Sequence, residues 1–207
     1  MRIMSKNILK IITLAVGLGL LISCNQTSPS STSVIKKGVA PVADNEVVIV
    51  EMEQPVYGKF TIELYSNIAP EMVKRFKELA REGFYDGTAI HRINQAVIQG
   101  GDPLSKDDNP KNDGSGKSNK PNVAAEFSDI LYDSAIVGAA RAKDVNSQNC
   151  QFFVTLKRTK EFDENYTIFG KVIEGMNNVR TIAGVPRDVE RPLDPPKIKS
   201  ITVQPKK

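Results

Sequence analysis

The chain has 207 residues, of which 40% are hydrophobic and 25% are charged, and this composition is typical of a globular protein. The length favours one domain with an extension. The net charge is +4, but residues 1–23 contain three basic residues and no acidic one, which leaves only +1 for the rest. This near balance excludes a strongly basic surface, and we expect no nucleic-acid partner.

Residues 1–23 have the pattern of an export signal. A short basic start precedes an apolar run from Ile11 to Ile22, which is too short to span a bilayer comfortably. The sequence Leu21-Ile22-Ser23-Cys24 resembles the bacterial lipobox, which implies cleavage before Cys24 and lipidation of its thiol and amine. The alternative is a plain signal peptide followed by an unrelated cysteine. We expect a lipid-anchored protein on the periplasmic side of the cell envelope.

The anchor would continue into a tether. Residues 24–45 are rich in Ser, Thr and Pro and show no apolar periodicity, so we expect a flexible coil that reaches roughly 25 Å. Asn25 replaces the aspartate that commonly retains lipoproteins at an inner membrane, which favours the outer membrane. If Cys24 is lipidated, Cys150 has no partner in the chain and is either buried or reactive. The apolar pair Phe152-Phe153 favours burial.

Residues 46–207 are predicted to form the folded domain. Alternating apolar residues indicate strands at 46–52 and 60–64, and shorter strands are predicted at 88–93, 97–99, 136–140, 152–156, 167–173 and 198–203. Pro70 begins a predicted helix that ends at Gly83, and its apolar stripe should pack on the core. A second helix is predicted at Met176–Ala183. Many short strands with two helices favour a closed barrel or a sandwich.

The segment 107–122 is polar, rich in Gly and Asn, and aperiodic, so it is predicted to be a long surface loop. Its acidic residues raise the possibility of a calcium loop. Lys111 and Lys120 would then occupy ligand positions, which excludes that reading, and we expect no metal.

Six ordered motifs resemble those of cyclophilin-type peptidyl-prolyl isomerases. They are the segment 83–88 with His91-Arg92, then 99–102, 125–127, 140–141, 150–153 and 169–172. The resemblance covers residues 46–204. It implies a mainly β fold, a closed eight-stranded antiparallel barrel capped by two helices. It also implies cis/trans exchange about the bond before proline, which is hindered by about 18 to 20 kcal/mol.

The resemblance also implies the roles of individual residues. Arg92 would donate to the prolyl nitrogen of the twisted amide, because arginine is always charged and cannot act as a base. His91 is expected to be a structural neighbour of this site, without an acid or base role. The expected binding residues are Gln99, Gln151 and the backbone at Ala140 and Arg141, with Val97, Phe153, Phe162 and Tyr166 around the proline. No cofactor is required.

One segment departs from the family pattern. The interval from His91 to Gln99 is eight residues, one fewer than usual, and Ala96 and Val97 stand where an apolar Phe-Met pair is expected. The missing aromatic could lower specificity for proline by about 10- to 200-fold.

Three functions follow from these patterns. The first is a monomeric envelope isomerase that acts on X-Pro bonds of exported, unfolded proteins. The second is a binding module for proline-containing peptides with weak or no turnover, which the altered pocket would explain. The third is a surface-exposed adhesion lipoprotein.

Overall fold

The structure is a computed structural model, and it describes residues 34–107 and 109–206. The predicted signal peptide and Cys24 lie outside these residues. The described part is mainly β, with two α-helices, three short 3-10 helices (η1, η2 and η3) and ten strands. In chain order these are β1 (Glu46–Met52), η1 (Pro55–Tyr57), β2 (Lys59–Leu64), α1 (Pro70–Arg81), β3 (Arg92–Ile93), β4 (Val97–Gly100), η2 (Pro103–Lys106), β5 (Ile136–Ala139), β6 (Phe152–Thr155), η3 (Lys160–Phe162), β7 (Ile168–Glu174), α2 (Met176–Ala183), β8 (Arg187–Asp188), β9 (Arg191–Pro192) and β10 (Ile198–Pro205).

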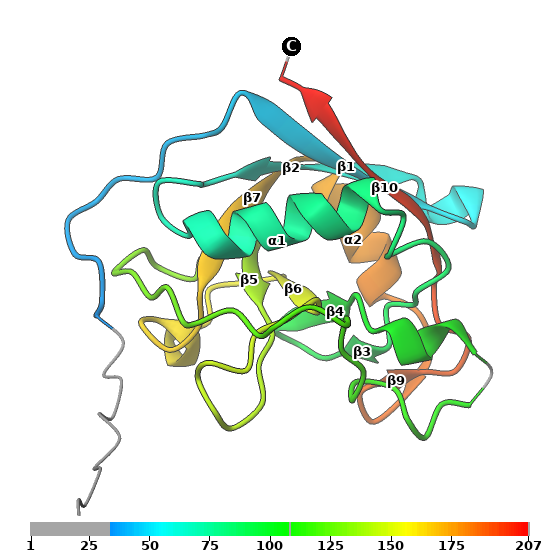
Figure 1. Cartoon of the computed structure of the whole chain (residues 1–207). Helices are drawn as coiled ribbons and strands as arrows, with labels where there is room; N and C mark the ends of the chain where they lie inside the picture. The colour runs from blue at the N-terminus through cyan, green and yellow to red at the C-terminus, as the bar shows by residue number, and fades with distance from the viewer. Residues whose placement is uncertain (1–33, 108, 207) are drawn as a thin grey trace, which may run out of the picture. The chain divides into compact units, whose positions relative to one another are not determined.

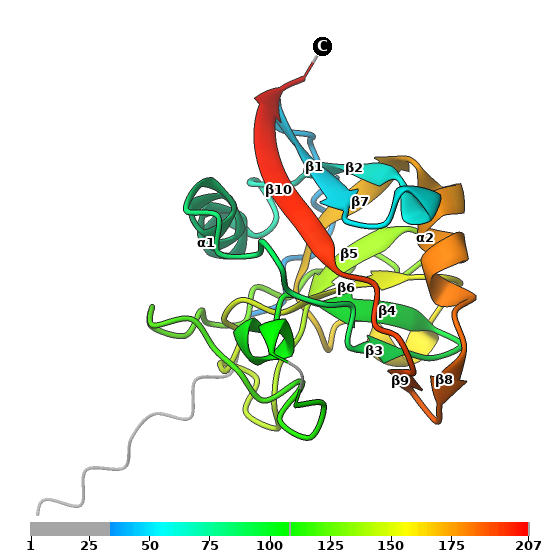
Figure 2. The ribbon, with the colours of Figure 1, turned by 90° about the vertical axis from the view of Figure 1, so that its right-hand side faces the viewer.

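Eight of the strands form one antiparallel sheet in the order β10-β1-β2-β7-β5-β6-β4-β3, and β8 pairs with β9 in a separate hairpin. Figure 1 shows the sheet with its helices, and Figure 2 shows α1 and α2 at opposite ends of the curled sheet, where both pack on the main core. The predicted helix stripe is confirmed, since its four residues Met72, Phe76, Leu79 and Ala80 are buried in the main core. Among the described residues, no helix has the length and apolar character needed to cross a membrane.

The predicted closed barrel is wrong, because the sheet is an open, curled half-barrel. Strands β10 and β3 are its two edges, and the described residues form no ladder between them. A single bridge joins Ala89 to Lys197 near this gap. The predicted strand 88–93 is formed only at Arg92–Ile93, and two residues are too few to pair along β10.

The sheet separates two apolar clusters. Successive residues of a strand face opposite sides, so neighbours in sequence enter different clusters. The main core takes Phe152 together with the buried faces of both helices, whereas Phe153 joins a second cluster with Val97 and Tyr132 on the other side. This confirms the prediction that one phenylalanine of the pair enters the core and the other leaves it.

The described part of the predicted tether is not a free coil. Lys36 pairs with Ser128 in a bridge, and its ammonium donates to the Ile68 carbonyl at 2.7 Å. Further along, Asp44 accepts from Lys77 of α1 at 2.6 Å. These contacts were not predictable from periodicity, because residues 34–45 have no apolar repeat and bind mainly through polar groups. The domain is therefore preceded by an arm that packs on it.

Candidate active site

The centre of the site is the hairpin formed by β3 and β4. Arg92 pairs with Gln99 in this hairpin, and the Asn94 N–H donates to the Val97 carbonyl at 3.0 Å to close a tight turn. The Asn94 side-chain oxygen accepts from the backbone N–H groups of Ala96 and Val97 at 2.8 and 2.9 Å. The shorter segment thus leaves only Gln95 and Ala96 between the hydrogen-bonded pair Asn94 and Val97. Val97 points to the face of Arg92 and Gln99, while Ala96 lies in the turn.

A chain of amide hydrogen bonds extends from Arg92 along this face. Arg92 Nη1 donates to Gln99 Oε1 at 3.1 Å, and Gln99 Nε2 donates to Gln151 Oε1 at 2.9 Å. Gln151 Nε2 in turn donates to the carbonyls of Gly114 and Gly116, each at 3.0 Å. Each donor has an acceptor, so the chain fixes the orientation of both glutamines. The structure therefore brings the three predicted polar residues together.

Arg92 has a second partner that sequence patterns did not predict. Its Nε donates to Glu190 Oε2 at 2.6 Å, and Asn94 Nδ2 donates to Glu190 Oε1 at 2.9 Å. The hydrogen bonds from Arg92 and then from Asn94 lower the pKa of Glu190 below its usual range, so it is ionised at neutral pH. No sequence signal pointed to this residue, because it lies 98 positions after Arg92 in a hairpin without an apolar pattern.

The four residues predicted to surround the proline form one apolar wall. The Phe153 ring contacts those of Phe162 and Tyr166 edge-on, with centroids 5.3 and 5.6 Å apart, and stacks on Tyr132 at 5.8 Å. Val97 belongs to the same cluster. Phe153 and Val97 are only 3% and 1% exposed, while Phe162 and Tyr166 are partly exposed and form the accessible part of the wall.

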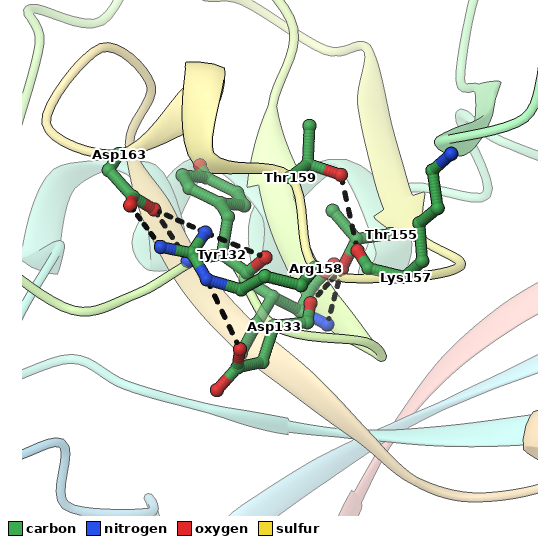
Figure 3. A network of polar contacts seen from close by, with 8 residues as sticks. Tyr132, Asp133, Thr155, Lys157, Arg158, Thr159 and Asp163 are labelled. Carbon is green, nitrogen blue, oxygen red and sulfur yellow. Dashed lines mark hydrogen bonds and ion pairs between the residues drawn. The ribbon is translucent and has the colours of Figure 1, made fainter.

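A polar network fixes the segment that carries Phe162, and Figure 3 shows it. Arg158 forms ion pairs with Asp163, at the end of η3, and with Asp133 at 3.4 Å. Asp163 also accepts from the Tyr132 N–H at 2.9 Å. The segment that carries Tyr132 and the segment that carries Phe162 are therefore held together by ion pairs and a hydrogen bond as well as by apolar contact.

Ala140 and Arg141 border a cavity of about 340 Å³ that Gln99 and Gln151 also line. The Ala140 N–H is already used, since it donates to the Gln151 carbonyl at 3.0 Å. The Arg141 guanidinium lies over the Tyr166 ring, 4.6 Å from its centroid, and connects the polar cavity to the apolar wall. All nine predicted site residues therefore lie on one face of the sheet.

Gly138 allows the wall to pack closely. A Cβ atom at this position would overlap the Phe153 ring and lie 2.7 Å from the Tyr132 hydroxyl. We expect Gly138→Ala to lower the free energy of unfolding by about 1 to 3 kcal/mol through overpacking, measured by urea denaturation. Gly184→Ala is the control, because its Cβ would lie no closer than 3.4 Å to any atom outside its chain neighbours and should change little. Equal effects of the two substitutions would contradict this packing.

His91 is buried next to the site, and neither ring nitrogen has a hydrogen-bond partner among the described residues. Burial, the largest influence, lowers the pKa of His91 below its usual value of 6.5, and the Asp102 charge offsets part of the shift. The imidazole is therefore neutral at pH 7, which fits the predicted structural role.

This shift predicts a pH dependence of stability. Between the lowered pKa and 6.5 the unfolded chain binds a proton at His91 that the folded chain does not, so stability should fall as the pH drops through this window and stay level above it. Thermal unfolding from pH 8 to pH 5 measures this, and His91→Gln should show a smaller loss. The chain has one histidine, so NMR can follow its imidazole without ambiguity. Titration of that imidazole at or above pH 6.5 in the folded protein would contradict the prediction.

Cys150 is buried, as predicted, at 1% exposure. Burial raises the pKa of its thiol to about 11, which makes it a poor nucleophile. Within the described ranges, no group of three or more His, Cys, Asp or Glu side chains is placed to hold a metal ion.

Comparison with known proteins agrees with this geometry. Residues 47–203 match the family model "Cyclophilin type peptidyl-prolyl cis-trans isomerase/CLD". The chain is 35% identical over 147 residues to the peptidyl-prolyl cis-trans isomerase cypE of Dictyostelium discoideum, which covers 68% of this chain and 88% of that protein. It is 36% identical over 149 residues to a probable peptidyl-prolyl cis-trans isomerase of Brucella suis, and the match covers 69% of this chain and 74% of that protein.

A solved structure gives the same result. A cyclophilin-type isomerase of Cryptosporidium parvum superposes with a TM-score of 0.69 at 28% identity, covering 78% of this chain and 99% of that one, and the same protein has been solved in the presence of the dipeptide Ala-Pro. These similarities support the isomerase and not the binding module without turnover. The chain belongs to the family of cyclophilin-type peptidyl-prolyl cis-trans isomerases.

Proposed function

We propose that this isomerase acts on X-Pro bonds of unfolded exported proteins while it is tethered to the cell envelope. The support is the basic and apolar start of the chain followed by Leu21-Ile22-Ser23-Cys24. Acylation of Cys24 would give a durable anchor, because each buried methylene contributes roughly 0.8 kcal/mol. We propose the periplasmic side, at the outer membrane, and a monomeric protein.

The packed arm at residues 34–45 limits the distance between the proposed anchor and the domain. If Cys24 is the anchor, only residues 25–33 remain between the lipid and the first described residue. Nine residues span at most roughly 30 Å even when fully extended. The domain would then work close to the membrane surface.

In the proposed mechanism Arg92 stabilises the twisted amide. Twisting localises the lone pair on the prolyl nitrogen, and a fixed guanidinium donates to it more strongly than to the planar amide. The observation that carries this role is the double attachment of Arg92 to Gln99 and Glu190, which leaves three of its five N–H groups without a partner among the described residues. Proton transfer and covalent steps are not needed.

The remaining site residues would hold the substrate. The proline ring would rest on the wall at Phe162 and Tyr166, above Phe153, and the residues before it would enter the cavity at Ala140 and Arg141. The structure of the Cryptosporidium parvum protein that was solved in the presence of the dipeptide Ala-Pro is consistent with such a ligand. Val97 supplies less surface than an aromatic residue would, so we expect lower affinity for proline than in relatives that carry one.

Cell fractionation tests the anchor. The full chain expressed in a Gram-negative host should be found in the membrane fraction, and mass spectrometry should find an acylated N-terminus at Cys24. The Cys24→Ala variant should be found in the soluble fraction with unchanged isomerase activity. Recovery of the unmodified chain as a soluble protein would overturn the anchoring without affecting the isomerase assignment.

A further inference from the structure

The hairpin of β8 and β9 brings Glu190 to the side of Arg92. Figures 1 and 2 both show β9 beside β3. Glu190 is held at three points: its carbonyl accepts from the Ile93 N–H at 2.7 Å, and its two carboxylate oxygens accept from Arg92 and Asn94. The carboxylate is therefore fixed relative to the strand that carries Arg92.

This contact restricts the guanidinium more than Gln99 alone can. Glu190 binds Nε and Gln99 binds Nη1, so two different nitrogens of one planar group are attached. Two attachment points fix both the position of the plane and its rotation, whereas one would leave an arginine side chain free to turn. The Arg92 side chain is 42% exposed, so packing alone does not hold it in place.

The turn that places Glu190 is itself unusual. Val189 has a φ of 54°, in the region that β-branched residues avoid, and it is 87% exposed, so little packing of its side chain compensates the cost. Such strain persists only where the surrounding structure imposes the conformation. Here the pairing of Asp188 with Arg191 and the Ile93–Glu190 bond impose it.

We propose that Glu190 is a positioning residue of the isomerase, which orients the Arg92 guanidinium through its hydrogen bond to Nε. The proposal rests on the role of Arg92 given above. A carboxylate beside a catalytic cation has two opposite effects: it fixes the cation, and it weakens the positive field at the prolyl nitrogen. Loss of the fixed orientation would lower kcat when Glu190 is removed, whereas loss of the negative charge would raise it. We expect the first effect to be the larger.

Two substitutions separate these effects in steady-state isomerisation of an X-Pro peptide. Glu190→Ala removes both the hydrogen bond and the charge, and we expect kcat to fall by about 10- to 100-fold with KM changed less than about twofold. Glu190→Gln keeps an acceptor for Arg92 Nε and should retain at least about a third of the wild-type kcat. Glu51→Ala is the matched control, because Glu51 also forms an exposed ion pair, with Lys199 at 2.7 Å, but lies on β1 far along the sheet. It should leave kcat unchanged.

A double-mutant cycle tests whether Glu190 acts through Arg92. In the Arg92→Ala background, Glu190→Ala should cause no further loss, whereas a general structural defect would persist there. An increase in kcat for Glu190→Ala, an equal loss in Glu190→Gln, or a wild-type rate for Glu190→Ala would each overturn the proposal. If Arg92→Ala itself retained the wild-type rate, the proposed role of Arg92 would fail instead, so the two failures are distinguishable.

Discussion

Replacing Arg92 by alanine should lower kcat/KM for an X-Pro peptide by about 10²- to 10³-fold, the usual cost of removing one donor that stabilises the transition state. The loss should appear mainly in kcat, because the donor acts on the twisted amide and the planar amide gains little from it. A coupled peptide assay with the purified variant measures both constants.

Two controls make this result specific to the guanidinium. Arg92→Lys keeps the charge but cannot bind Glu190 and Gln99 through separate nitrogens, so it should recover only a small part of the activity. Arg81→Ala removes an exposed arginine of α1 that pairs with Glu46 at 2.8 Å, and it should have wild-type activity. Wild-type activity in Arg92→Ala would contradict the site assignment.

Replacing Phe153 by alanine should lower the free energy of unfolding by about 3 to 5 kcal/mol and also weaken peptide binding. The side chain is 3% exposed and contacts the rings of Tyr132, Phe162 and Tyr166, so its removal leaves a cavity and loosens the wall above it. Urea denaturation measures the first effect, and the KM of the folded variant at low temperature measures the second.

Phe152→Ala is the matched control for this prediction. Phe152 precedes Phe153 on β6 but enters the main core, where it packs against Phe76. It should cost a similar amount of stability while the folded fraction keeps its KM. If both variants raised KM equally, the wall would have no special part in binding.

Local patterns predicted the regular elements well. The helix stripe on α1, the second helix at Met176–Ala183 and the alternation in β1 and β2 all reflect burial of one face, and a burial pattern can be read from a single sequence. The residues of the site were predicted for a different reason, because ordered motifs resembled those of a family. What failed was the closure of the barrel, since closure depends on pairing between β3 and β10, and such a long-range contact leaves no local signal.

Glu190 and the packed arm were missed for a related reason. Both make contacts through polar groups and not through an apolar repeat. The contact of Glu190 with Arg92 spans 98 residues, and that of Lys36 with Ile68 spans 32. The shortened loop was visible in the sequence, but its consequence was not. Asn94 Oδ1 accepts from the N–H groups of Ala96 and Val97 in the turn, and Val97 is buried in the cluster that contains Phe153.

Exchange NMR on an X-Pro peptide with catalytic amounts of the protein separates an isomerase from a peptide-binding protein, because it detects binding and turnover in one experiment. Uncatalysed exchange takes tens of seconds or longer. We expect cis/trans exchange peaks at subsecond mixing times with the wild-type protein and none with Arg92→Ala. Peptide resonances that shift on binding to the wild-type protein, with exchange no faster than in free peptide, would contradict this expectation.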